Sequence, residues 1–152
     1  MTTKDRIISN NKKAFYSYSI STKFLSGIQL NGSEIKSIRS GQVNISEAFC
    51  FVSDNELWIK NMDIKKYQFC QNNDYNPIRQ RKLLLKRIEI NKIQKHLNEK
   101  GMTLIPIKLI INEKGFAKIE IALGKGKKLY DKRETLKKRD ANMEMERKKR
   151  EK

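Results

Sequence analysis

The chain has little of the side-chain chemistry that metal sites and many catalytic sites require. Its 152 residues include one histidine, His96, and two cysteines, Cys50 and Cys70, which lie far apart in the sequence. A zinc site needs about four such ligands in close spacing, and a cysteine nucleophile needs a base such as histidine beside it. We therefore predict no metal and no cofactor, and we expect each cysteine to be a half-buried thiol rather than part of a disulfide.

Long hydrophobic runs are also missing. No apolar stretch approaches the length of a membrane-spanning helix, and residues 1–13 lack the apolar core of a signal peptide. From these absences the sequence predicts a cytoplasmic protein without a membrane partner.

The glycine-containing segment at residues 124–128 lacks the features of a nucleotide-binding loop. Its sequence, Gly-Lys-Gly-Lys-Lys, has neither the second glycine at the required spacing nor the terminal Lys-Ser or Lys-Thr. Four scattered acids could hold Mg²⁺ in a nuclease, although turn and surface roles explain them more simply: Asp54, Glu56, Asp63 and Asp74. We therefore predict that the chain is not an enzyme and keep a magnesium-dependent ribonuclease as a remote alternative.

Acidic residues are scarce relative to basic ones. The 34 Lys and Arg residues outnumber the 17 Asp and Glu residues, so the formal net charge is +17. A charge of this size attracts polyanions and repels itself in the free protein, and a bound phosphate backbone relieves that repulsion. A lysine-rich genome would raise the lysine count, but it would not explain why the number of acidic residues is so much lower than the number of basic ones. The composition favours nucleic-acid binding over binding to an anionic membrane surface.

Alternating apolar residues and turn signals predict a mainly β fold. Residues 14–20 and 24–30 are expected to form one strand or a bent pair of strands, and further strands are expected over 48–53, 56–62, 102–111 and 116–123. Asp54-Asn55 separates two of them, and both residue types tolerate the positive φ of a tight hairpin. Strands of this number suggest an antiparallel barrel of the oligonucleotide-binding (OB-like) type, with helices beside it, over residues 11–124.

Two helices are expected between these strands. Ser33 can cap a short helix that Gly41 ends. A longer helix is predicted over residues 79–99, because apolar residues recur there at spacings of three and four. The first ten residues are polar, and we expect them to be disordered.

The last segment, residues 125–152, differs in composition from the rest. It holds thirteen Lys and Arg and six Asp and Glu, a net charge of +7. Leu129, Leu136 and Met143 recur at every seventh position, but a stripe one residue wide is too narrow to bury a helix firmly. We predict a basic tail that is disordered alone and helical when bound to a partner.

Basic residues also gather at three places in the predicted barrel. They precede an aromatic run near the start, lie three apart on the short helix, and crowd the start of the long helix, where backbone N–H groups would help to bind phosphate. A solvated face would explain any one of these clusters equally well. The residues are Asn11, Lys12 and Lys13; Lys36 and Arg39; and Arg79, Arg81, Lys82, Lys86 and Arg87.

Five segments, in order along the chain, resemble the SsrA-binding protein family (small protein B, SmpB), the protein partner of transfer-messenger RNA. The matching segments are residues 11–14, 32–39, 77–85, 101–106 and 121–133. They extend from near the start of the chain into the basic tail. Leu25 departs from the pattern, because the family usually has an acidic residue there.

The resemblance implies an OB-like barrel that binds the tRNA-like domain of transfer-messenger RNA and has no enzymatic activity. The complex would enter stalled ribosomes, where the tail occupies the empty mRNA channel near the decoding centre and the nascent peptide is tagged for degradation. Elongation factor Tu and alanyl-tRNA synthetase would be indirect partners through the RNA, and the protein would act as a monomer. A generic ribosome-associated RNA-binding protein with the same barrel is the main alternative.

The predicted site residues fall into two groups. The RNA-binding group is Asn11, Lys12, Lys13, Glu34, Lys36, Arg39, Arg79, Arg81, Lys82, Leu84, Lys125, Lys127 and Lys128. The group expected at the decoding centre is Tyr130, Asp131, Lys132, Arg133, Lys137, Lys138 and Arg139. On the family analogy, Tyr130 would stack on a base of ribosomal RNA.

Overall fold

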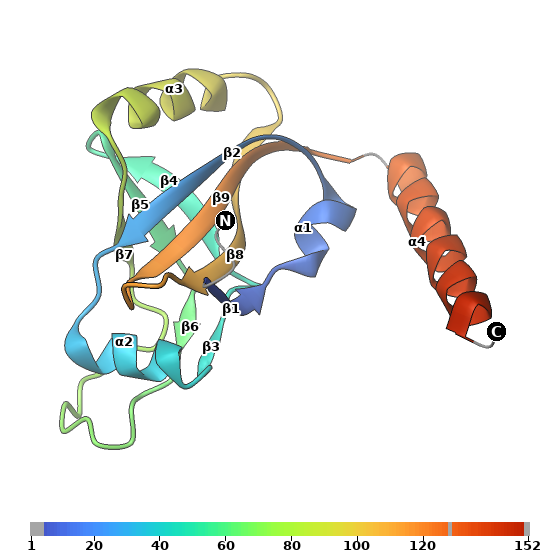
Figure 1. Ribbon diagram of the computed structural model, residues 1–152. Helices are drawn as coiled ribbons and strands as arrows, with labels where there is room; N and C mark the ends of the chain where they lie inside the picture. The colour runs from blue at the N-terminus through green and yellow to red at the C-terminus, as the bar shows by residue number, and fades with distance from the viewer. Residues whose placement is uncertain (1–4, 128, 151–152) are drawn as a thin grey trace.

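A computed structural model of the chain describes residues 5–127 and 129–150, which form one curved antiparallel sheet, a two-stranded sheet and four helices (Figure 1). The strands of the large sheet, in spatial order, are β1 (Arg6–Asn10), β8 (Met102–Ile111), β9 (Ala117–Gly126), β2 (Tyr18–Ile28), β7 (Arg81–Leu84), β5 (Glu56–Lys60) and β4 (Phe49–Ser53). The small sheet pairs β3 (Val43–Asn44) with β6 (Asp63–Ile64). The helices are α1 (Lys12–Ser17), α2 (Gly32–Arg39), α3 (Arg87–Leu97) and α4 (Leu129–Arg150).

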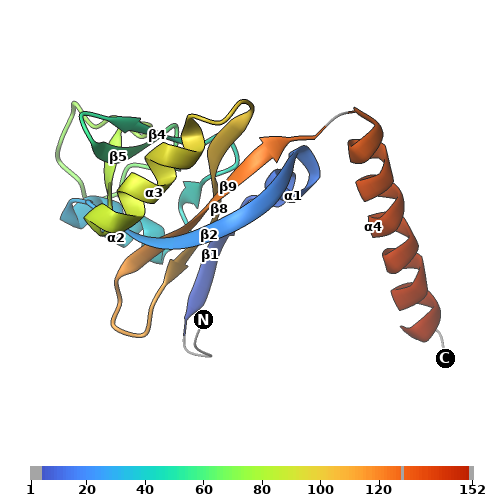
Figure 2. The same ribbon diagram turned by 90° about the horizontal axis from the view of Figure 1, so that it is seen from above.

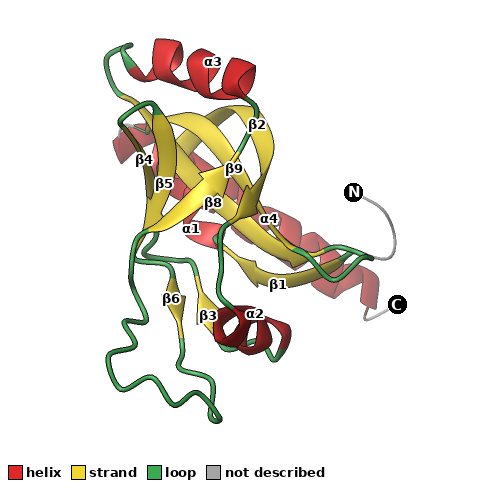
Figure 3. Ribbon diagram, turned by 90° about the vertical axis from the view of Figure 1, so that its left-hand side faces the viewer, coloured by secondary structure: helices red, strands yellow, loops and turns green. Residues whose placement is uncertain are grey.

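The large sheet curls into an almost closed barrel, which confirms the predicted fold class. Strand β4 at one edge comes to lie beside β8 without joining its hydrogen-bonded ladder. Side chains that alternate along the strands fill the interior, and several are fully buried there: Leu57, Leu83, Leu109, Ile119 and Ile121. Helices α3 and α2 lie at two ends of this barrel (Figure 3).

The hairpin predicted around Asp54-Asn55 is confirmed. The two residues join β4 to β5 with φ angles of 52° and 62°, the left-handed conformation that a two-residue hairpin turn requires. Arg87 on α3 donates a hydrogen bond to the carbonyl of Asn55 at 2.7 Å, so the turn also anchors a helix.

Three local predictions were wrong. Residues 6–10 form β1, paired with β8, instead of a disordered segment, and residues 1–4 of that predicted segment lie outside the described residues. Residues 12–17 form helix α1, so the first long strand begins only at Tyr18. The helix predicted over residues 79–99 is divided into strand β7 and the shorter helix α3.

The division of that predicted helix has a packing reason. Arg81 and Leu83 are fully buried while Leu84 is exposed, so this part of the segment alternates as a strand does. Pairing with β2 and β5 on its two sides gives β7 the backbone hydrogen bonds that a helix would otherwise supply. Helical spacing holds only from Ile90 onward, where α3 covers one end of the barrel.

The basic tail is a single helix, α4, which stands off from the barrel and has α1 as its neighbour (Figure 2). Whether this helix depends on a partner stays a prediction. Strand β9 continues through Gly126, two residues past the expected end of the barrel domain. In the described part of the chain, no helix combines the length and apolar composition needed to span a membrane.

The hairpin turn yields a test of the fold. Asn55→Ala should lower the free energy of unfolding by about 1–2 kcal/mol, because alanine is strained in the left-handed conformation. Asn55→Gly is the matched control: it removes the same side chain but accepts positive φ, and should be closer to the wild type. Urea unfolding of both variants measures the difference, and equal values would contradict the role assigned to the turn.

Candidate nucleic-acid interface

Helix α2 carries several predicted site residues, and a buried carboxylate sets its position. Asn31 caps the helix by accepting a hydrogen bond from the backbone N–H of Glu34 at 3.0 Å. The Glu34 carboxylate accepts one in return from the backbone N–H of Asn31 at 3.1 Å. This reciprocal capping box satisfies two N–H groups that the first turn of a helix leaves unpaired.

The same carboxylate binds two arginines from the segment around β7. Arg81 donates from Nε to Glu34 Oε2 at 2.6 Å, and Arg79 donates from Nε at 3.2 Å and from Nη2 to Oε1. Arg81 also donates to the carbonyl of Met62 at 2.7 Å and to that of Pro77 at 3.1 Å. Glu34, Arg79 and Arg81, here called the Glu34 cluster, therefore join α2, β7 and the loop after β6.

Burial alone would raise the pKa of Glu34, but its partners reverse the effect. Hydrogen bonds from Arg79, the Asn31 backbone and Arg81, together with the Arg81 charge, hold this pKa below its ordinary value of 4.5. Glu34 and Arg81 have no exposed surface, so in this structure they can support an RNA-binding surface only from beneath, and their place in the RNA-binding group stays a prediction. Arg79 keeps 37% of its side chain exposed, and its RNA contact stays a prediction.

Outward-facing residues of α2 meet the sheet at a small surface hollow. Arg39 is exposed and donates from Nη2 to the carbonyl of Gly115 at 3.0 Å, which ties α2 to the turn between β8 and β9. Arg39 also lines a hollow of about 320 Å³ together with Leu84, Phe116 and Lys118. We call it the Leu84 hollow. Leu84 and Phe116 are 51% and 61% exposed, an arrangement of apolar and cationic groups that suits a nucleic-acid surface.

Lys118 was missed as a site residue, although the alternation of the last strand places it on the solvent face. A Cβ atom on Gly27 would lie 3.3 Å from Leu84 Cβ and 3.6 Å from Lys118 Nζ, so the glycine lets both side chains approach β2 closely. Lys82, on the same strand as Leu84, forms an ion pair with Glu56 at 3.0 Å. Because Gly27, Leu84 and Lys118 are far apart in the sequence, their proximity could not be predicted from residue spacing.

A second group of predicted residues lies at α1, on another side of the barrel. Asn11 is 4% exposed, and its place in the RNA-binding group stays a prediction. Asn11 donates to two carbonyls of β8: from its backbone N–H to Ile107 at 2.7 Å and from Nδ2 to Pro106 at 2.9 Å. The ladder of β8 shifts register next to Pro106, and Asn11 uses the carbonyls at this irregularity to anchor α1.

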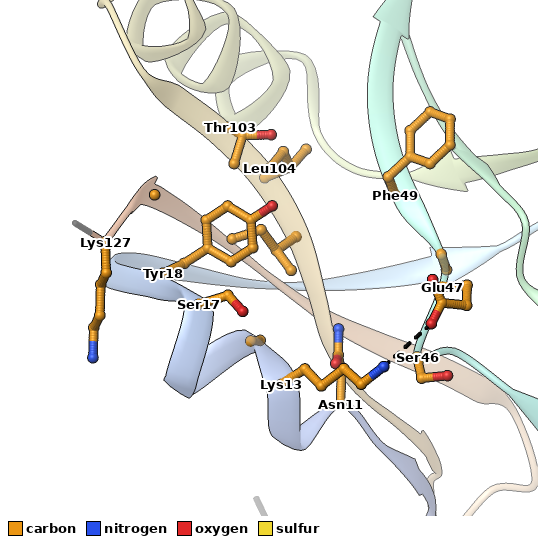
Figure 4. A pocket seen from close by; sticks show the side chains of 14 residues that line it. Asn11, Lys13, Ser17, Tyr18, Ser46, Glu47, Phe49, Thr103, Leu104 and Lys127 are labelled. Atoms are coloured by element: carbon orange, nitrogen blue, oxygen red, sulfur yellow. Dashed lines mark hydrogen bonds and ion pairs between the residues drawn. The ribbon is translucent and has the colours of Figure 1, made fainter. Parts of the chain in front are cut away.

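The lysines around α1 remain at the surface. Lys12 and Lys13 are exposed, and Lys13 forms an ion pair with Glu47 at 3.4 Å across the mouth of a hollow of about 460 Å³ (Figure 4). Such an exposed pair contributes little to stability and leaves the lysine available. Lys127 donates from Nζ to the carbonyl of Phe15 at 3.0 Å and from its backbone to Ser17 at 2.9 Å, so the start of the tail is fastened to α1.

The remaining predicted residues lie at and beyond the end of β9. Lys125 is exposed on β9, and Lys128 falls outside the described residues. All seven residues predicted for the decoding centre lie on α4. Of these, Arg133, Lys137, Lys138 and Arg139 are exposed.

The described residues offer little for metal or thiol chemistry. They contain no group of three or more His, Cys, Asp or Glu side chains placed to hold a metal ion. Cys50 and Cys70 are both free thiols, and burial raises the pKa of Cys50. Near the end of α3, His96 Nδ1 lies 3.3 Å from Glu99 Oε1.

Comparison with known proteins assigns the chain to a family. The profile of the family described as "SmpB protein" matches residues 8–151. The chain belongs to the SmpB family. Among its relatives, a protein named SsrA-binding protein from Cytophaga hutchinsonii is 49% identical over 151 residues, covering 97% of this chain and 98% of the relative. Another of that name, from Christiangramia forsetii, is 45% identical over 144 residues, covering 95% and 92%.

A solved structure agrees with this SmpB assignment. It is described as "tmRNA-SmpB: a journey to the center of the bacterial ribosome", and its matching chain is 36% identical to this one. The match has a TM-score of 0.67 and covers 84% of this chain and 92% of the other. The resemblance expected from five short sequence segments is therefore confirmed over most of the chain.

The Glu34 cluster generates a stability prediction. Glu34→Gln should lower the free energy of unfolding by about 3–5 kcal/mol, because it leaves the buried Arg81 charge without its counter-charge. Glu47→Gln, which removes the exposed partner of Lys13, is the control and should change it by less than about 1 kcal/mol. Urea unfolding at neutral pH measures both, and similar losses would contradict the importance of burial.

The pH dependence of the same variant checks the cause. Because the pKa of Glu34 is lower in the folded protein, its contribution to stability is complete above the ordinary value of 4.5. The contribution should disappear as pH falls from that value through the folded-state pKa. The stability difference between the wild type and Glu34→Gln should therefore shrink in acid, and a constant difference would contradict the ion-pair explanation.

Proposed function

We propose that the chain binds the tRNA-like domain of transfer-messenger RNA and delivers it to stalled ribosomes for trans-translation. Membership of the SmpB family and the name of its relatives, SsrA-binding protein, support this function. A neighbour of known structure is described with transfer-messenger RNA and the bacterial ribosome. The observation that carries the proposal is a barrel with an exposed apolar and basic surface, joined to a separate basic helix.

The barrel would bind the tRNA-like domain. Arg39 and Lys118 can neutralise phosphates, while Leu84 and Phe116 offer apolar area for a sugar or an unstacked base. Folded RNA is recognised largely by shape, and a hollow with a rigid rim suits that mode of recognition. The Glu34 cluster holds α2, which contributes Ile35 and Arg39 to the lining of this hollow.

Helix α4 would serve the ribosome instead of the barrel. The helix stands away from the barrel, and its exposed cations include Arg133, Lys137, Lys138 and Arg139. A basic helix of this kind fits an RNA-lined channel, such as the empty mRNA channel beside the decoding centre. Elongation factor Tu and alanyl-tRNA synthetase would meet the protein only through the RNA.

The protein would act by binding, without a catalytic step of its own. Labelled tRNA-like RNA incubated with the protein and Mg²⁺ should remain intact. Cleavage that depends on the protein and on Mg²⁺ would favour the ribonuclease alternative.

The role of the Leu84 hollow in RNA binding can be tested by removing one positive charge from it. Lys118→Gln should weaken binding to the tRNA-like domain several-fold and lower the slope of log K against log salt by about 0.7–0.9, because one phosphate contact is lost. Lys114→Gln removes the same charge from the exposed turn between β8 and β9 and serves as the control. Filter binding at several salt concentrations measures both, and equal effects would reduce the role of Lys118 to net charge.

The division of work between barrel and tail can be tested in the full chain. Reversing Lys137, Lys138 and Arg139 to glutamate should leave most of the affinity for the isolated tRNA-like domain and abolish tagging at stalled ribosomes. The control reverses Lys92, Lys95 and Lys100, three exposed lysines on and after α3, and should keep tagging. If the tail variant lost RNA affinity as strongly as tagging, the proposed division would be wrong.

A further inference from the structure

A second basic hollow lies beside α2 and is not explained by the surface around Leu84. It has a volume of about 690 Å³ and opens between α2 and the loop that follows β6. We call it the Tyr67 pocket, and its main lining residues are Lys36, Arg39, Gln42, Lys66, Tyr67 and Gln68. Three of these are cations and none of the described lining residues is acidic, so the pocket favours an anion.

The ring of Tyr67 lines the pocket, and the ring of Phe69 lies next to it. The rings of Tyr67 and Phe69 meet edge to face, with centroids 5.5 Å apart and planes at 68°. Phe69 is 70% exposed, so its apolar ring is in contact with water and would be buried if a partner covered it. Lys36 Nζ lies 5.5 Å from the centroid of the Tyr67 ring, so a cation and an aromatic face are presented together.

The loop that bears these rings is fastened to α2 at its start. Ser37, a buried residue of α2, donates from its hydroxyl to the carbonyl of Lys65 at 2.7 Å. The backbone N–H of Lys65 donates to the carbonyl of Gln42 at 2.9 Å, and that of Cys70 to Tyr67 at 2.9 Å. The loop projects below the barrel next to α2 (Figure 3), and the hydrogen bond from Cys70 to Tyr67 closes a turn around its aromatic segment.

We propose that the Tyr67 pocket binds one unpaired nucleotide of an RNA. The base would stack on the ring of Tyr67 with the Phe69 ring at its edge, and its flanking phosphates would meet Lys36, Lys66 and Arg39. A base inside a duplex cannot present its face in this way, so the ligand is a loop or single-stranded nucleotide. The inference rests on the proposed function only in taking RNA as the partner.

The polar wall of the pocket favours a nucleotide over an anionic lipid headgroup. Gln42 and Gln68 each carry an amide with both donors and an acceptor, which suits the mixed edge of a nucleobase. A lipid phosphate would use only the cations and donors. The experiment below treats a lipid surface as a separate outcome.

The test uses the full chain and a uridine-rich RNA hexamer with one 2-aminopurine. Binding to the wild type should quench the 2-aminopurine fluorescence, because the base stacks on an aromatic ring. The double variant Tyr67→Leu, Phe69→Leu should lose this quenching and bind the hexamer roughly fivefold or more weakly. Tyr67→Phe, which keeps the ring, should retain the quenching.

Phe15→Leu is the matched control, since Phe15 is an exposed ring with Lys23 Nζ 5.6 Å from its centroid, outside the pocket. It should bind the hexamer as the wild type does. A short RNA duplex should bind the wild type and the double variant equally, and thermal unfolding should show that both are folded.

Several results would overturn the inference. They are unchanged quenching in the double variant, an equal loss of duplex binding, or loss of binding to phosphatidylserine vesicles while hexamer binding persists. The proposed function is judged separately, by binding of the wild type to the tRNA-like domain. If that binding is present while the double variant still quenches the hexamer normally, only the pocket assignment fails.

Discussion

The carboxylate of Glu34 is buried with two guanidinium groups that come from a distant part of the chain, and the arrangement around α2 depends on this contact. Removing an ion from water is costly, and the cost is offset only when every partner is in place. Here the carboxylate also caps α2, while Arg81 holds the carbonyls of Met62 and Pro77. One buried acid therefore orients a helix, a central strand and a long loop at once.

Both hollows that we connect with RNA are lined in part by α2, the helix that this buried cluster holds in position. Arg39 on α2 reaches the Leu84 hollow on one side and lines the Tyr67 pocket on the other. Glu34 and Arg81 have no exposed surface, and through their contacts they fix the position of α2, which carries the exposed Lys36 and Arg39. The buried polar residues between α2 and β7 thus have a positioning role, and in the function that we propose the exposed cations would supply the electrostatic attraction.

Local sequence signals predicted much of the fold, and they failed where pairing between distant segments decided the structure. The Asp54-Asn55 turn was found because its conformation depends on those two residues. The strand at Arg81–Leu84 was missed because its partners, β2 and β5, come from elsewhere in the chain. The strand at Arg6–Asn10 was missed for the same reason, since its polar residues pair at the edge beside β8.

The sequence by itself determined the net charge of +17, the barrel class, the separate basic tail and the family, because composition and short motifs carry these properties. Only the tertiary structure decided which charged residues face water. In the folded chain Glu34 and Arg81 are buried, Leu84 and Lys118 both lie next to Gly27, and Lys36 lies over the ring of Tyr67. Exposure and proximity depend on how distant segments pack, and no spacing along a single chain specifies that packing.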